Sequence, residues 1–117
     1  MEPIDLPLEQ QPSGLAWQEI LIGGGALAVD RRATVHYTGW LENGTQVDSS
    51  HARARPFSFP VGAGRVIKGW DEGVATMRVG GRRRLIVPSR LGYGDRAVGP
   101  IPAGSTLIFD VELIAVE

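Results

Sequence analysis

The sequence predicts an α+β fold in which an antiparallel sheet covers one short helix. Sixteen glycines and eight prolines divide the 117 residues into short β-rich runs, a pattern typical of strands and turns rather than of long helices. Only residues 65–77 have helical spacing, because Val66, Trp70, Val74 and Met77 recur at intervals of four, four and three. A chain of this length forms one domain around one hydrophobic core.

The expected elements follow in order along the chain. Residues 1–13 carry acidic residues and three prolines where a signal peptide needs an apolar run, so we expect a loosely held arm followed by the domain at 14–117. Gly69 and Gly73 predict that the helix is short. Two prolines make the run at 56–61 an edge strand. Strands are expected at 15–22, 33–41, from residue 45 onward, 56–61, 82–88 and 106–116.

The best-defined turn is the pair Asn43-Gly44, which predicts a two-residue type I′ hairpin loop because both residues tolerate positive φ. Residues whose numbers sum to 87 then face each other, so Asp48 lies opposite Gly39. Tyr37 and Asp48 become diagonal neighbours on one face, and Gly39 leaves room for the tyrosine hydroxyl to approach the carboxylate. The alternative is a solvated hairpin with an ordinary polar aspartate.

Charge and composition exclude several classes of function. Twelve basic and 13 acidic residues leave a formal net charge of -1, so no overall field attracts nucleic acid or anionic lipid. The absence of cysteine excludes disulfides, thiolate nucleophiles and cysteine-bearing metal sites. No window approaches the ~18 apolar residues of a membrane span. We therefore expect a soluble, cytoplasmic protein that binds neither nucleic acid nor membrane and needs no metal or other cofactor.

Signatures of acid/base and nucleophilic catalysis are missing as well. Asp71 and Glu72 are adjacent on the predicted helix, where neighbouring side chains diverge by about 100°, so they make a poor acid/base pair. His36 and His51 lack partners at ligand spacing and are expected to be structural or solvated. The arginines at 82–84 alternate between the faces of a strand, which predicts solvated surface or pairing within the chain rather than a nucleic-acid patch.

Two aromatic residues are candidates for a pocket. Trp70 lies on a short helix and is by default a core residue, but beneath a concave sheet it can also form the floor of a pocket. Tyr93 lies between two glycines in the long loop at 89–105, where a partly exposed side chain is expected. Neither position by itself decides between packing and binding.

Several segments, taken in order, resemble the FKBP-type peptidyl-prolyl cis-trans isomerases. They are "VHYTGWLENGTQVDSS", "PFSFPVGAGRVIKGWDEGV", "MRVGGRRRLIVP" and "LGYG" through "IPAGSTLIFDVEL". The resemblance runs from about Leu15 to Glu117 and is strongest to the small single-domain bacterial members. It implies a curved antiparallel β-sheet of about five strands wrapped around one short α-helix, with a pocket between them.

The resemblance also implies roles for individual residues. Trp70 would form the floor under the proline ring, and the backbone N–H of Ile67 and the hydroxyl of Tyr93 would hold substrate carbonyls. Asp48 would be a polar rim group that Arg53 orients. The residues expected to act in catalysis are Asp48, Ile67, Trp70, Tyr93 and Phe109. Those expected to line the substrate site are Tyr37, Val47, Arg53, Phe57, Val66 and Ile101.

The implied reaction is rotation about Xaa-Pro bonds in peptides and unfolded chains, which assists protein folding. Rotation breaks no covalent bond, and its barrier of ~18–20 kcal/mol is the loss of amide resonance, so an apolar pocket can lower it without acid, base or cofactor. Tacrolimus and rapamycin are further candidate ligands, and a monomer is expected. Two alternatives stay open: a binding or chaperone-like module without turnover, and a hydrolase that uses Asp48.

Two positions depart from the pattern of the family. Val47 stands where a bulky aromatic residue is common, and strict hairpin parity would point it away from Asp48 unless the strand contains a twist or a bulge. The loop "DRAVGPIPAG" is about one residue shorter than usual and has Ala103 where a second proline is frequent. Both departures are expected to affect macrolide binding more than isomerisation.

Overall fold

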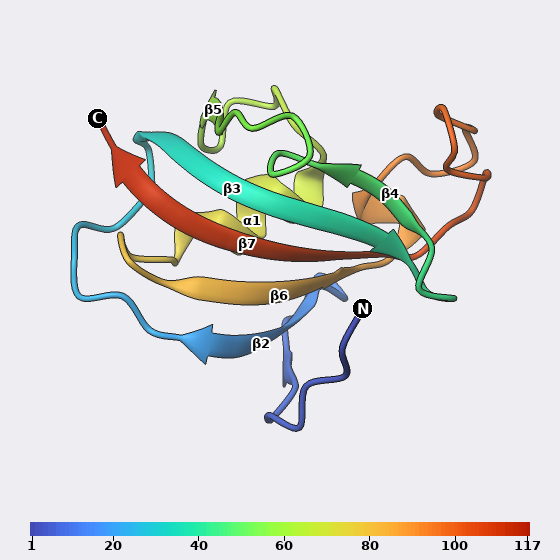
Figure 1. Ribbon diagram of the computed structural model, residues 1–117, viewed down its shortest axis with the longest axis horizontal. Helices are drawn as coiled ribbons and strands as arrows, with labels where there is room; N and C mark the ends of the chain where they lie inside the picture. The colour runs from blue at the N-terminus through green and yellow to red at the C-terminus, as the bar shows by residue number, and fades with distance from the viewer.

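The structure, a computed structural model of residues 1–117, consists of one antiparallel sheet with a short helix packed on one face (Figure 1). The helix α1 is Lys68–Ala75, and a 3₁₀ turn, η1, follows at Ser89–Leu91. The strands are β1 (Glu9–Gln10), β2 (Ala16–Leu21), β3 (Arg32–Leu41), β4 (Gln46–Ser49), β5 (Phe57–Pro60), β6 (Arg82–Val87) and β7 (Leu107–Val116).

The sheet is organised around the long strand β3. The strands follow the order β1-β2-β6-β7-β3-β4, so β7 lies between β6 and β3 (Figure 1). The other edge of β3 is shared, since β5 pairs with Arg32–Val35 and β4 pairs with Thr38–Trp40. The connection between β4 and β5 leaves the sheet where these two pairings meet, which brings a loop to the middle of β3.

The predicted fold class is confirmed, but the sheet has seven strands rather than about five. Of these seven, only β1 lies outside the strand ranges expected from the sequence, because two residues are too few to show any alternation of apolar and polar residues. It lies in the arm at 1–13 and pairs with β2. The side-chain amide of Gln18 also donates to the carbonyls of Ile4 and Leu6, both at 3.0 Å. The looseness of this arm stays a prediction.

The hairpin turn differs from the predicted type I′ loop. Gly44 has a φ of 89°, but Asn43 does not have a positive φ. Gly44 N–H donates to the Leu41 carbonyl at 2.9 Å, and Leu41 N–H donates to the Thr45 carbonyl at 2.9 Å. The loop is therefore a type I turn followed by a left-handed glycine. The Asn43 side chain accepts from Thr45 N–H at 2.9 Å instead of adopting a left-handed backbone.

A bulge in β4 restores the register that the turn had shifted. Trp40 pairs with Gln46, whereas Gly39 pairs with Asp48, so Val47 is an extra residue. The predicted pairing of Asp48 with Gly39 is confirmed even though the turn was wrong, because the longer loop and the bulge each shift the register by one residue in opposite directions.

Two glycines allow α1 to lie close against β6. A Cβ at Gly69 would lie 2.6 Å from Val87 Cγ1, and one at Gly73 would lie 2.6 Å from Leu85 Cδ2. The helix extends only over Lys68–Ala75 rather than over 65–77. No helix is long enough to span a membrane. The fully buried side chains beneath the sheet include Leu15, Val35, Val74, Leu85, Val87, Leu107 and Leu113.

The arginines of β6 are paired within the chain, as one of the two sequence interpretations expected. Arg83 is buried on the helix side, where Nε lies 2.6 Å from Glu19 Oε1 and Nη1 donates to the Gly73 carbonyl at 2.7 Å. A cation here complements the negative end of the helix dipole. Arg84 pairs with Asp110 at 2.6 Å on the opposite face of the strand.

Candidate active site

A cavity of about 200 Å³ opens between the sheet and the N-terminal end of α1. Its lining is mostly apolar and comes from β3, β4, β5, β7, the helix, the loop before the helix and the loop that follows η1. The lining residues are Tyr37, Asp48, Phe57, Arg65, Val66, Ile67, Trp70, Tyr93 and Phe109. The structure thus brings most of the predicted site residues together around one hollow.

Trp70 forms the floor of this cavity. Its ring is only 4 % exposed and meets the rings of Tyr37 and Phe109 edge to face, with centroid separations of 4.8 and 5.4 Å. Phe59 is buried against it at 5.6 Å, while Phe57 is 37 % exposed and lies at the mouth. Edge-to-face packing stabilises such clusters beyond simple burial. Trp70 is therefore a core residue and a pocket floor at once.

The space above Gly39 is occupied differently from the sequence expectation. We expected the missing side chain to give room to the Tyr37 hydroxyl. Instead, a Cβ at Gly39 would lie 2.7 Å from Phe109 Cε1, so the edge of that ring uses the space. The two residues are direct partners in the β3–β7 ladder. Glycine at position 39 thus leaves the space that the edge of the Phe109 ring occupies.

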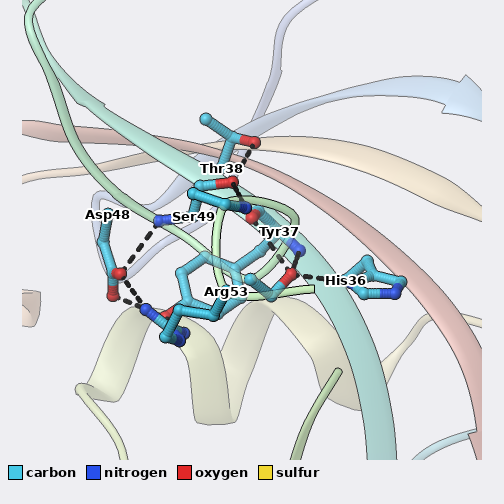
Figure 2. Close-up of polar contacts among 8 residues, drawn as sticks. His36, Tyr37, Thr38, Asp48, Ser49 and Arg53 are labelled. Atoms are coloured by element: carbon cyan, nitrogen blue, oxygen red, sulfur yellow. Dashed lines mark hydrogen bonds and ion pairs between the residues drawn. The ribbon is translucent and has the colours of Figure 1, made fainter. Parts of the chain in front are cut away.

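Tyr37, Asp48 and Arg53 form a hydrogen-bonded group at the rim (Figure 2). The Tyr37 hydroxyl donates to Asp48 Oδ2 at 2.5 Å, and Ser49 N–H donates to Asp48 Oδ1 at 2.9 Å. Arg53 Nη1 pairs with Oδ1, and its Nη2 donates to the Tyr37 hydroxyl at 2.9 Å. The predicted contact between the tyrosine and the aspartate is confirmed.

The environment makes Asp48 a poor general base. Burial raises the pKa of its carboxyl group, but the hydrogen bonds from Tyr37 and Arg53 outweigh this and hold the pKa below its ordinary value. Burial raises the pKa of Tyr37, and its hydrogen bond to Asp48 raises it further. A general base that acts near neutral pH needs a raised pKa. The rim group is thus an ionised carboxylate with a neutral phenol, which disfavours hydrolysis.

Three predicted site residues do not line the cavity. The bulge leaves Val47 partly buried against the core, outside the lining. Ile101 is 8 % exposed and belongs to the core, where it exchanges two 2.9 Å backbone hydrogen bonds with Val98. Arg53 touches the site only through Tyr37 and Asp48. Spacing alone could not show how the bulge and this loop direct their side chains.

The Ile67 N–H and the Tyr93 hydroxyl at the cavity have no hydrogen-bond partner within the chain, and neither has the indole N–H of Trp70, which is buried in the floor. The Ile67 carbonyl accepts from Trp70 N–H at 3.0 Å and begins the helix, but the Ile67 N–H makes no hydrogen bond with the protein. The first N–H groups of a helix are generally left without such partners. The hydroxyl of Tyr93, which lines the opposite loop, also makes no hydrogen bond with the protein. Both donors are available to a ligand.

Asp71 is a positioning residue that the sequence did not reveal. Its two carboxylate oxygens accept from the N–H groups of Gly62 and Gly64 at 2.8 and 3.0 Å. These contacts hold the loop that carries Arg65, Val66 and Ile67 to the cavity. Glu72 points elsewhere and accepts from Ser13 at 2.8 Å, so the adjacent carboxylates diverge as predicted. The one local signal was an acid in the first helical turn after "GAG".

His36 and His51 lie away from the cavity. Their rings stack at 4.4 Å, and His36 Nδ1 shares a 2.8 Å hydrogen bond with Ser50. Figure 2 shows His36 on the opposite side from Asp48 and Arg53. His36 is therefore held by contacts within the chain, which is one of the two outcomes expected for the histidines.

Comparison with known proteins decides the family. Residues 24–114 match the family described as FKBP-type peptidyl-prolyl cis-trans isomerase. The chain belongs to this family. It is 52 % identical over 105 residues to the FK506-binding protein of Neisseria meningitidis serogroup B, covering 88 % of this chain and 96 % of that protein. It is 57 % identical over 84 residues to FK506-binding protein 2 of Emericella nidulans, covering 71 % of this chain and 62 % of that protein.

Solved FKBP structures share the fold. The crystal structure of AtFKBP13 matches with a TM-score of 0.89 at 41 % identity, covering 95 % of this chain and 99 % of that one. FkpA from Escherichia coli matches with a TM-score of 0.88 at 38 % identity, covering 94 % of this chain and 51 % of the larger FkpA chain. The antiparallel sheet and the single helix beneath it are therefore those of an FKBP domain.

Proposed function

We propose that this protein is a peptidyl-prolyl cis-trans isomerase that accelerates rotation about Xaa-Pro bonds. The observation that carries the proposal is the cavity itself: an aromatic floor at Trp70, with two unpaired donors, Ile67 N–H and the Tyr93 hydroxyl, at its edge. No activated nucleophile or base accompanies them, and rotation about an amide needs neither. The sequence resemblance and the family membership support the same activity.

Catalysis rests on the difference between the planar amide and its twisted transition state. The planar amide is more charge-separated because resonance spreads charge from nitrogen to oxygen. Moving it from water to a surface of Trp70, Phe57 and Phe109 raises its free energy more than that of the twisted form. The proline ring sits over Trp70 in this scheme. Contacts of the protein that are stronger with the twisted amide than with the planar amide lower the barrier further.

The polar groups of the site position the substrate. Ile67 N–H and the Tyr93 hydroxyl donate to carbonyl oxygens on either side of the proline, which holds the backbone while the bond rotates. Asp48 fixes the Tyr37 ring through its 2.5 Å hydrogen bond, and Arg53 fixes Asp48. We assign Asp48 to this positioning role rather than to proton transfer, since its pKa is lowered.

The substrates we propose are proline-containing peptides and unfolded chains, whose uncatalysed isomerisation takes tens of seconds or longer. The relatives from Neisseria meningitidis and Emericella nidulans are named FK506-binding proteins. We extend this to the present cavity and propose that FK506 (tacrolimus), and the related macrolide rapamycin, compete with the peptide over Trp70.

The test is NMR exchange spectroscopy on an Xaa-Pro peptide, with and without the protein. We expect the cis and trans signals to exchange faster than in buffer. Phe57→Ala, at the mouth of the cavity, should lower kcat/KM about five-fold through lost apolar contact. Leu21→Ala is the matched control, because this exposed side chain lies outside the cavity and should leave kcat/KM unchanged.

The principal rival is a module that binds proline segments without turnover. A peptide that binds to the protein while its exchange stays at the rate in buffer would refute the isomerase and support this rival. Equal losses of activity in Phe57→Ala and Leu21→Ala would show that the activity does not depend on the cavity, which would refute the site assignment.

A further inference from the structure

A second hollow, of about 390 Å³, adjoins the cavity and is unusually basic. It shares Phe57 with the cavity, and Arg53 reaches from it to Asp48 on the cavity wall. The two hollows are thus continuous along one surface. The residues of the second hollow, here called the arginine rim, are Arg32, Arg53, Arg55, Pro56, Phe57 and Ser58.

Most of the positive charge here is not neutralised by the chain. Arg53 pairs with Asp48, but Arg32 and Arg55 have no carboxylate within 4.0 Å and make no side-chain hydrogen bond. Arg65, which lines the cavity itself, is likewise without an ion pair. The protein as a whole carries a net charge of -1. Positive charge is therefore concentrated beside the cavity although the protein is close to neutral.

The backbone that carries these arginines is fixed. The turn before β5 is closed by hydrogen bonds from Ala54 N–H to the His51 carbonyl at 3.0 Å and from Arg55 N–H to the Ser50 carbonyl at 3.1 Å. Arg32 lies on β3, opposite Pro60 of β5. The guanidinium groups thus project from hydrogen-bonded elements into a hollow that adjoins the mouth of the cavity at Phe57.

We propose that the arginine rim selects proline-containing segments that carry acidic side chains near the proline. The inference rests on the proposed isomerase function and names its preferred substrate class. An extended chain advances about 3.3–3.6 Å per residue, so a carboxylate two to four residues from the proline over Trp70 reaches a neighbouring hollow. The carboxylates of glutamate and aspartate suit the planar guanidinium groups of Arg32 and Arg55, which can each donate two parallel hydrogen bonds. Nucleic acid is the less suitable partner because the remaining surface is acidic on balance.

The experiment compares peptide pairs that differ only in charge. One pair carries two glutamates or two glutamines at two and three residues before the Xaa-Pro bond, and a second pair carries them at two and three residues after it. At low salt, in at least one placement, the glutamate peptide should show a kcat/KM about 3- to 10-fold above its glutamine twin, the range of two exposed ion pairs. The difference should vanish at about 0.5 M salt.

A double variant locates the effect. Arg32→Gln with Arg55→Gln, two residues outside the cavity lining, should abolish the preference while kcat/KM for the glutamine peptide stays unchanged. The matched control, Arg78→Gln with Arg82→Gln, removes the same charge from a distant surface and should keep the preference. Exchange of the glutamine peptide at the buffer rate would instead count against the proposed function itself.

Two outcomes would overturn the arginine rim as a substrate selector. The first is an equal kcat/KM for glutamate and glutamine peptides in both placements, with isomerisation intact. The second is tighter binding of a single-stranded 20-nucleotide DNA than of the glutamate peptide, lost in the Arg32→Gln and Arg55→Gln variant, which would assign the patch to nucleic acid.

Discussion

Replacing Gly69 with alanine has two opposite effects on the stability of the protein, and their sizes can be compared. Alanine is favoured over glycine in a helix by about 1 kcal/mol, so propensity alone predicts a more stable protein. The new Cβ, however, would lie 2.6 Å from Val87 Cγ1 and 2.9 Å from Cγ2, where ordinary contact begins at 3.4 Å. Valine cannot rotate away cheaply because its χ1 is restricted, and overpacking costs about 1–3 kcal/mol.

We therefore expect Gly69→Ala to lower the free energy of unfolding by about 1 kcal/mol and the Tm by about 4 °C. Because the helix would move away from β6 at the end that carries Ile67, KM for the peptide should rise as well. Urea unfolding followed by tryptophan fluorescence measures the stability. Gly24→Ala is the control, since a Cβ there meets nothing within 4 Å and should be neutral or stabilising.

A double-mutant cycle distinguishes the contact from a general effect. Adding Val87→Ala to Gly69→Ala removes the clashing methyl groups. The double variant should therefore lose less unfolding free energy than the two single variants together, by at least about 0.5 kcal/mol. A Gly69→Ala protein that is as stable as its parent or more stable would refute the argument that close helix–sheet contact requires glycine here.

Further predictions concern the rim group, the floor and the loop. Asp48→Ala should lower kcat/KM less than about ten-fold, whereas Trp70→Leu should reduce activity and stability together; near-complete loss in a folded Asp48→Ala protein would favour proton transfer instead. The parent should be more stable than Asp48→Asn above the ordinary aspartate pKa of ~3.9. It should lose this advantage as the pH falls through the lowered pKa of Asp48 in the folded state. A constant difference between the urea midpoints of the two proteins from pH 2 to 7 would contradict this. Ala54 has a φ of 51°, so Ala54→Gly should raise the free energy of unfolding by up to about 1 kcal/mol. A lower stability of this variant in thermal unfolding would exclude backbone strain at this position.

The sequence predicted the site better than it predicted the local geometry that builds it. Tyr37 and Asp48 were placed on one face by counting from a two-residue turn, and the turn has three residues. The count held because the bulge at Val47 compensates. Turn residues report local backbone preferences, whereas a bulge depends on what both faces of a strand must bury, so single-sequence patterns could not reveal it.

Long-range contacts were the other limit. Periodicity placed Trp70 on the apolar face of the helix and the resemblance gave Phe109 a role in the site, but neither showed that the Phe109 ring lies over Gly39. Asp71 looked like half of an unlikely acid/base pair, and its actual partners are two backbone N–H groups of the preceding loop. Which partner fills a gap or satisfies a carboxylate is decided by elements far apart along the chain, and spacing within one element carries no record of it.

The central position of β7 has a consequence for synthesis of the protein. β7 pairs with both β3 and β6, yet it is the last of the strands to be made. Until residues 107–116 are available to fold, the edges of β3 and β6 that β7 occupies have no partner. Open edges of apolar strands invite pairing with other chains. We therefore expect the nascent chain to be most prone to aggregation before the final strand pairs with β3 and β6.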